Sequence, residues 1–269
     1  MTMRSTWNGQ VSFGLVSIPV RLYSATESKN IAFHQVHERD GGQIKYKRVC
    51  EVDGEEVPYP EIAKGYETDD GQLVVLTDRD LAAVPAPAAK TAEVLEFVPL
   101  EAIDPIYFDK TYYVEPQKAG IKPYLLLRDA LQKSGRVAIA KIALRQRESL
   151  AVLRVYSDVL MISTMLWPDE VRAADFPFLG EDHPQIRPQE MTMAATLIEG
   201  MSDDVFDPAK YHDTYRAALT EMVEAKIAGH ESIAVPAAAG ADEEVADLLA
   251  ALSASVEQAQ RPHSNSGPS

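Results

Sequence analysis

The sequence predicts an α+β protein in which a β-rich body is followed by an α-helical end. Three observations predict this order. Apolar and polar residues alternate over residues 10–23 and in several later segments, as in strands with one buried face. Two Asp-Gly pairs, Asp53-Gly54 and Asp70-Gly71, are typical of tight hairpin turns. From Pro188 onward the apolar period becomes helical.

The N-terminal third is expected to contain strands, two short ribbons and one helix. The alternation over residues 10–23 slips by one position after Leu15, which indicates a bulge or a strand that turns a corner. Each Asp-Gly pair predicts a two-residue turn between two antiparallel strands. Thr77, with Asp80 three residues later, is typical of a helix start, because these side chains can cap the free N–H groups of a first turn.

The middle of the chain is expected to be a sheet interrupted by one helix. β-Branched and aromatic residues predict strands over residues 91–98 and 106–114. A helix follows, with Pro123 in its first turn and Gly135 at its end. Further strands are predicted over residues 136–144, 150–156 and 159–166, the first two joined by a polar turn, Arg145-Gln146-Arg147-Glu148.

The C-terminal third is expected to be helical and then irregular, with one helix from Pro188 and another from Asp207 to Gly229. The predicted organisation is a β-rich body (residues 1–185), a helical arm (186–229), a linker (230–241), an amphipathic helix (242–259) and a disordered tail (260–269). An isolated helix of this length is marginal in water, so its apolar stripe is expected either to bind a partner or to pack on its own core. The candidate partner-binding residues are Val245, Leu248, Leu249 and Leu252.

The chain is acidic overall, but its basic residues are unevenly distributed. It has 26 Lys and Arg against 41 Asp and Glu, for a net charge of −15. Residues 110–154 nevertheless hold ten basic and three acidic residues, about twice the density of bases expected by chance. This segment carries +7 and leaves −22 for the rest of the chain. A polyanionic ligand is therefore compatible with the acidic total, provided that the fold gathers these bases on one concave face.

Catalytic and metal-binding signatures are largely absent, so we expect neither an enzyme nor a bound metal or cofactor. Phosphate-binding loops, dinucleotide-binding glycine patterns, nucleophile elbows and zinc-protease motifs do not occur in the sequence. His34 and His37 lie upstream of Cys50 and Asp53, but structural zinc usually needs paired thiolates, and the chain has one cysteine. The first residues lack an apolar signal core, and no apolar run approaches the roughly 18 residues that span a membrane. A cytoplasmic protein without a membrane partner is expected.

Several long stretches resemble the prokaryotic Ku family, in the family's order: WNGQVSFGLVSIPVRLYSATE (residues 7–27), IKYKRVCEVDGEEV (44–57), IDPIYFDKTYYVEP (103–116), ALRQRESLAVLR (143–154) and FDPAKYHDTYRAAL (206–219). The resemblance implies a β-barrel core with a bridging arm and a helical C-terminal arm, paired into a homodimeric ring that threads double-stranded DNA ends. It also implies a role in bacterial non-homologous end joining, association with the nucleoid when bound to DNA, and recruitment of DNA ligase D by the terminal helix.

Binding of DNA ends whatever their sequence requires contacts to phosphate and sugar, for which Lys and Arg are the suited residues. The candidate DNA-contacting residues are Lys45, Lys47, Arg48, Lys133, Arg136, Lys141, Arg145 and Arg147. Strand alternation places Lys45 and Lys47 on one face with Arg48 on the other, and it puts Arg145 and Arg147 on a shared face. The alternative interpretation of each residue is a solvated surface charge.

Two other functions stay open from the sequence alone. One is a structural scaffold that never touches DNA, and the other is a nuclease that holds metal ions with some of the many acidic residues. Competition between linear and closed circular duplex separates an encircling protein from a scaffold. Mg²⁺-dependent degradation of a DNA end identifies a nuclease.

Overall fold

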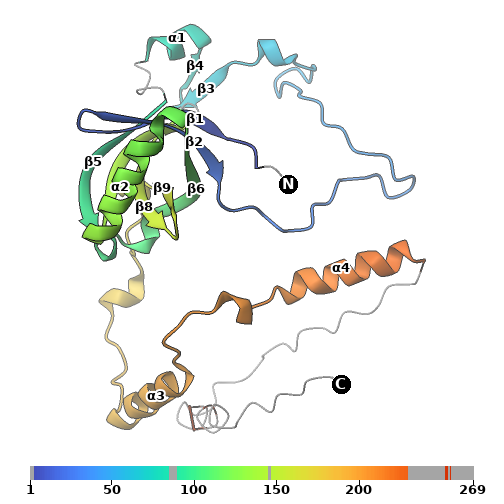
Figure 1. Cartoon of the computed structure of the whole chain (residues 1–269). Helices are drawn as coiled ribbons and strands as arrows, with labels where there is room; N and C mark the ends of the chain where they lie inside the picture. Colours follow the sequence, from blue (N-terminus) through green and yellow to red (C-terminus); the bar gives the residue numbers. More distant parts are fainter. Residues whose placement is uncertain (1–2, 85–89, 145–146, 230–251, 254, 256–269) are drawn as a thin grey trace. The chain divides into compact units, whose positions relative to one another are not determined.

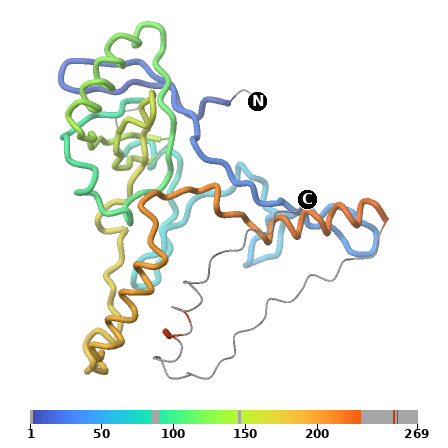
Figure 2. The backbone as a smooth tube through the Cα atoms, turned by 60° about the horizontal axis from the view of Figure 1, so that its bottom comes forward, coloured from blue at the N-terminus to red at the C-terminus, as the bar shows by residue number. Residues whose placement is uncertain are grey.

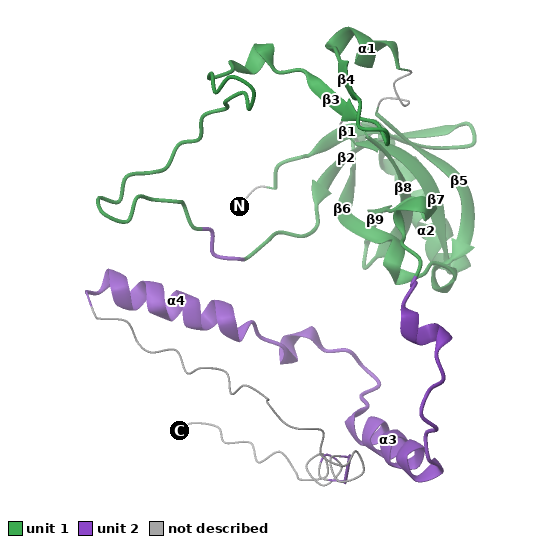
Figure 3. Ribbon diagram, turned by 180° about the vertical axis from the view of Figure 1, so that it is seen from behind, with its two compact units in different colours: residues 1–29, 33–173 green, residues 30–32, 174–269 purple. Residues whose placement is uncertain are grey.

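The computed structural model describes residues 3–84, 90–144, 147–229, 252–253 and 255. The chain divides into two compact units, one of residues 1–29 and 33–173 and the other of residues 30–32 and 174–269 (Figure 3). Within the described residues, every named strand lies in the first unit, and the second unit contributes helices. The predicted α+β class is confirmed.

A closed barrel of seven strands forms the centre of the first unit (Figure 1). In spatial order the strands are β1 (Trp7–Phe13), β2 (Val16–Ser24), β6 (Phe108–Pro116), β9 (Val159–Met165), β8 (Arg147–Tyr156), β7 (Arg136–Leu144) and β5 (Thr91–Pro99). Six of the neighbouring pairs are antiparallel. The parallel pair β1–β5, with Val11 opposite Ala92, closes the barrel and leaves it without a free edge.

The slip in the alternation over residues 10–23 marks a hairpin, so the expected bulge or corner is wrong. Gly14 and Leu15 form a two-residue turn, and Gly14 takes the left-handed conformation with φ 55°. The turn reverses the chain and restarts the alternation on β2, where Ile18, Val20 and Leu22 are all buried. A change in the phase of the pattern therefore corresponds to a change of strand.

Helix α2 (Ile121–Ser134) packs across the barrel (Figure 1), and its Leu127 and Leu131 belong to the same buried apolar cluster as the strands. The Tyr124 hydroxyl donates to the Val114 carbonyl at 2.9 Å and accepts from the Leu160 N–H at 2.7 Å. Burial raises the pKa of Tyr124, because the phenolate would lose its hydration. The buried Tyr124 hydroxyl is therefore hydrogen-bonded to two strands of the barrel, and these bonds fix α2 against the strands.

The strands and helix predicted for the middle of the chain are present, with shifts at their ends. Strand β6 begins two residues later than expected, because Pro105–Tyr107 forms a 3₁₀ turn capped by the Asp104 side chain. Strand β8 begins at Arg147, three residues earlier than predicted. Helix α2 ends at Gly135 in the left-handed conformation, with φ 64°, as the glycine predicted.

The two Asp-Gly pairs form turns of different lengths from those predicted. Strands β3 (Lys64–Glu67) and β4 (Leu73–Leu76) pair as an antiparallel hairpin, with Gly71 at φ 81° in a three-residue turn closed by the Thr68 N–H and the Gln72 carbonyl. Around Asp53-Gly54 the ribbon is limited to a single bridge between Val49 and Glu56. No residue of β3 or β4 is buried.

Helix α1 (Asp78–Ala83) begins with the predicted capping pair. The Thr77 hydroxyl accepts from the Asp80 N–H at 3.3 Å, and the Asp80 carboxylate accepts from the Thr77 N–H at 2.8 Å. These bonds satisfy two N–H groups that a helix start otherwise leaves without a partner. The prediction of a helix start at Thr77 is confirmed.

The second unit contains α3 (Pro188–Met201) and α4 (Thr214–Ile227), joined by an extended stretch that Figure 2 follows along the chain. The helix expected from Asp207 starts later, because Pro208–Lys210 forms a 3₁₀ turn and Asp213 caps the Arg216 N–H at 2.9 Å. Neither α3 nor α4 has a buried residue within the described chain. Their apolar side chains are therefore available to a partner.

Candidate nucleic-acid interface

Two of the predicted DNA-contacting residues, Lys141 on β7 and Arg147 at the start of β8, lie in one surface cluster. The Lys141 ammonium is 3.9 Å from a Glu148 carboxylate oxygen and 5.6 Å from the centre of the Trp167 ring. The Arg147 guanidinium pairs with the Glu170 carboxylate. Each of these cations therefore faces a carboxylate of its own chain.

Glu170 is held by the backbone as well as by Arg147. The Trp167 N–H donates to Glu170 Oε2 at 2.8 Å, and the Trp167 indole Nε1 donates to the Glu148 carbonyl at 3.3 Å. The Trp167 N–H, reinforced by the Arg147 charge, holds the pKa of the Glu170 carboxyl below its usual range. With two basic and two acidic side chains the cluster is nearly balanced in charge, so a polyanion bound here would compete with the carboxylates for Lys141 and Arg147.

Lys133 and Arg136 lie at the opposite end of β7 from Lys141. Both are exposed, Lys133 in the last turn of α2 and Arg136 as the first residue of β7, where its guanidinium donates to the Phe97 carbonyl at 3.3 Å. Five strand positions separate Arg136 from Lys141, about 17 Å, and alternation directs their side chains to opposite faces. The predicted bases around β7 therefore form two separate groups, Lys133 with Arg136 and Lys141 with Arg147.

Lys45, Lys47 and Arg48 lie in an exposed segment without regular strand structure. The assignment of their faces by strand alternation is therefore wrong, because alternation needs a continuous strand. The Lys47 ammonium is 2.6 Å from a Glu56 carboxylate oxygen, and the Arg48 guanidinium lies 5.3 Å from the centre of the Tyr59 ring. At exposed positions an ion pair and a cation–ring contact are each weak. Lys47 and Arg48 are therefore accessible to a phosphate.

Several predicted residues lie outside the described residues. Among them are Arg145 and three of the four candidate partner-binding residues, Val245, Leu248 and Leu249. Leu252, the fourth, is helical and half-buried. The proposed linker (230–241) and tail (260–269) also lie outside the described part of the chain.

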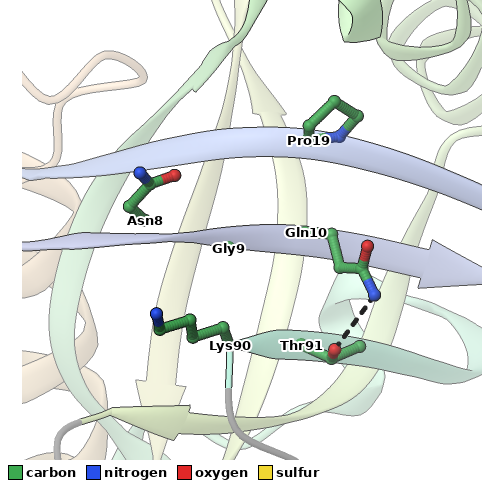
Figure 4. Close-up of a pocket in the computed structure, with 6 residues that line it drawn as sticks. All are labelled: Asn8, Gly9, Gln10, Pro19, Lys90 and Thr91. Atoms are coloured by element: carbon green, nitrogen blue, oxygen red, sulfur yellow. Dashed lines mark hydrogen bonds between the residues drawn. The ribbon is translucent and has the colours of Figure 1, made fainter.

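A polar pocket of about 300 Å³ opens on the barrel where β1 meets β5 (Figure 4). Its lining consists of Asn8, Gly9, Gln10, Pro19, Lys90 and Thr91. The Gln10 amide is fixed from both sides, since its oxygen accepts from the Ser17 hydroxyl at 2.7 Å and its nitrogen donates to the Thr91 hydroxyl at 3.3 Å. Sequence reasoning did not single out Lys90, because it lies outside the base-rich segment and next to no motif.

The described residues hold no group of three or more His, Cys, Asp or Glu that could bind a metal ion. Of the zinc set considered from the sequence, His37 instead contacts the Asp40 carboxylate at 3.0 Å. Among the described residues, no helix has the length and apolarity needed to cross a membrane.

Comparison with known proteins points to one family. The model of the Ku70/Ku80 β-barrel domain matches residues 12–193. A protein of Frankia casuarinae is 59% identical over 258 residues, which cover 96% of this chain and 64% of that protein. One of Mycolicibacterium smegmatis is 49% identical over 94% of this chain and 82% of its own length, and one of Mycobacterium tuberculosis is 44% identical over 98% of both. Each bears the name non-homologous end joining protein Ku. The chain thus spans slightly less than two thirds of the Frankia relative.

Proposed function

Because the chain belongs to the Ku family, we propose that it binds the ends of double-stranded DNA, whatever their sequence, as a ring-shaped homodimer in non-homologous end joining. The observation that carries the proposal is the alignment with end-joining proteins over at least 94% of this chain. The closed seven-stranded barrel is the domain that the family model describes. Within this proposal the protein protects DNA ends and has no enzymatic step of its own.

The charge distribution supports a channel for DNA. Residues 110–154 carry +7 while the rest of the chain carries −22. An assembly with bases toward an enclosed duplex and acids outward would repel DNA from its exterior and attract it to the lined opening. The carboxylates beside Lys141 and Arg147 moderate this attraction, so the grip depends on many weak phosphate contacts rather than on a few strong ones.

Exposed apolar side chains support pairing of two copies. Leu73 and Val75 on the β3–β4 hairpin are exposed, as are Met191 and Ile198 on α3. Where exposed apolar side chains lie together they mark an interaction site, and we assign these two elements to the pairing of two copies. A two-fold dimer also suits the ligand, because the duplex backbone has approximate two-fold symmetry and each copy can present an equivalent patch.

In this proposal the predicted terminal helix binds the second partner. In the sequence of residues 242–259, Val245, Leu248, Leu249 and Leu252 recur at helical spacing, and we assign the apolar stripe that this spacing predicts to DNA ligase D. Binding of the ligase to this helix would bring the enzyme to a DNA end held by the ring. The protein would then be found on the nucleoid wherever DNA ends are present.

The test is a competition between linear and covalently closed circular duplex of equal mass, at several salt concentrations. A closed ring loads only at an end, so linear DNA should compete strongly and sealed circles weakly. The logarithm of affinity should fall with the logarithm of salt by about 0.9 for each phosphate neutralised, and Lys141→Ala should flatten that slope by about one unit per lost contact. Equal competition by sealed circles would rule out the ring.

A further inference from the structure

The backbone of Lys90 is held in an unfavourable conformation by the closure of the barrel. Its φ is 68°, in the left-handed region that residues with a Cβ rarely adopt. The Lys90 carbonyl accepts from the Gln10 N–H at 2.8 Å, across the β1–β5 closure. Gly9 permits this approach, because a Cβ there would stand 2.2 Å from the Lys90 carbonyl oxygen. Such strain is concentrated at functional sites, and here it fixes the point from which the Lys90 side chain leaves the barrel.

The pocket beside Lys90 offers hydrogen-bond donors and no acid. Its lining contains no carboxylate, and Lys90 has no ion-pair partner within the described residues, unlike Lys141 and Arg147. The Asn8 side-chain oxygen accepts from the Gln117 amide at 2.7 Å, which leaves the Asn8 NH₂ group to donate. Figure 4 shows the Asn8 and Lys90 side chains on either side of the strand at Gly9. An ammonium and an amide NH₂ without an acidic neighbour favour an oxyanion.

The small number of donors in the pocket indicates which kind of oxyanion it binds. One ammonium and one amide on an exposed surface hold a small free anion only weakly, because water competes for the same groups. A phosphate of the duplex backbone is different, since it is one of many contacts made together and its binding releases condensed counterions. A contact to the backbone carries no sequence information, as sequence-independent binding requires.

We propose that the pocket formed by Asn8, Gln10 and Lys90 binds one backbone phosphate of the DNA duplex. The proposal rests on the DNA binding proposed above and gives it a contact point on the barrel, outside the base-rich segment of residues 110–154. The Lys90 ammonium neutralises the phosphate, the Asn8 amide donates to a second oxygen, and the Gln10 amide shapes the floor through its bonds to Ser17 and Thr91.

Three variants of the full chain test the pocket. Lys90→Gln removes the ammonium, Asn8→Asp introduces a carboxylate of nearly the same shape, and Lys90→Asn removes the charge with a residue that tolerates positive φ. Affinity for a short linear duplex is measured by fluorescence anisotropy at several salt concentrations. We expect both Lys90 variants to bind at least about threefold more weakly with a salt slope flatter by about 0.9 per lost contact, and Asn8→Asp to bind more weakly still.

Lys226→Gln on α4 is the matched control, since it makes the same charge change at another exposed lysine. Unchanged binding in the pocket variants overturns the proposal, and so does an equal loss in Lys226→Gln, because the effect is then one of total charge. Inorganic phosphate that binds the wild type but not Lys90→Gln, at constant ionic strength and without lowering the affinity for duplex, would assign the pocket to free phosphate and also overturn the proposal. Equal binding of linear and sealed circular DNA by the wild type would rule out the ring proposed above. Weaker DNA binding by the Lys90 variants would still place a backbone phosphate in the pocket, so the two proposals fail separately.

Discussion

Gly9 shows at the scale of one residue how tightly the barrel is closed. A Cβ at this position would stand 2.2 Å from the Lys90 carbonyl oxygen and 2.4 Å from the Trp7 ring. The Lys90 carbonyl cannot retreat without losing its bond from the Gln10 N–H, and the Trp7 indole is itself held by the Ala143 carbonyl at 3.0 Å. The space for a side chain is therefore absent rather than merely unused.

We expect Gly9→Ala to lower the free energy of unfolding by about 1–3 kcal/mol, as overpacking of a dense core does. Chemical denaturation followed by fluorescence measures this change. Gly200→Ala on α3 is the control, because nothing lies within 4 Å of its added Cβ and alanine is the better helix former, so a gain of about 0.5–1 kcal/mol is expected there. A Gly9→Ala protein as stable as the wild type would show that Lys90 does not approach β1 this closely.

At the scale of the element, the end of the β7–β8 pair is joined by charge to the segment that leaves β9. Glu170 accepts from the Trp167 N–H and pairs with Arg147, while the Trp167 indole donates to the Glu148 carbonyl. These contacts attach residues 167–170 to the strand end. The carboxylates of Glu148 and Glu170 reduce the positive potential that Lys141 and Arg147 would offer to the proposed DNA ligand.

We expect Glu170→Gln to destabilise the protein at neutral pH and to have no effect in acid. The folded state holds the pKa of Glu170 below its ordinary value of 4.5, so the ionised carboxylate stabilises the fold above that pH and loses this effect as the pH falls through the folded-state pKa. Thermal melting of both proteins from neutral to acid pH measures the difference. Glu221→Gln, an exposed change on α4, is the control, and a Glu170→Gln difference that is independent of pH would contradict the assignment.

At the scale of the whole molecule, we propose that DNA binding by the β-rich body (residues 1–185) and ligase binding by the terminal helix (242–259) are separate functions of one chain. The barrel buries its core within the first unit, whereas Leu252 lies in a helical segment of the second. A change in the terminal helix should therefore affect binding of the ligase and leave binding of DNA unchanged. The predicted apolar stripe of the terminal helix is the feature to alter, because an amphipathic helix binds a partner's groove through its apolar face.

We expect Leu252→Asp, or Leu248→Asp, to abolish recruitment of DNA ligase D and to leave DNA binding unchanged. Pull-down of the purified ligase and anisotropy with linear duplex measure the two effects. Ser253→Asp adds the same charge at an exposed neighbouring position and should retain the ligase. Intact ligase binding together with a lower melting temperature would mean that the stripe packs on its own chain.

Much of the fold was predictable because it depends on neighbours in the chain. The Thr77–Asp80 capping pair and the glycine end of α2 act within a single turn, and the period of two places strand β7 at the predicted bounds. The resemblance to Ku implied the barrel, and the family match bears this out. The basic residues could be named as candidates, although nothing in the sequence told which of them face an acid.

Local pattern alone determined the order of elements, the α+β class and the uneven charge, since propensity, capping and periodicity act over a few residues. Only the tertiary structure decided the reversal at Gly14, the parallel closure of β1 on β5, the pairing of Arg147 with Glu170 and the polar pocket around Lys90. These features join residues far apart along the chain. Their geometry follows from strand register and barrel closure, and therefore from the packing of the whole core rather than from any one segment.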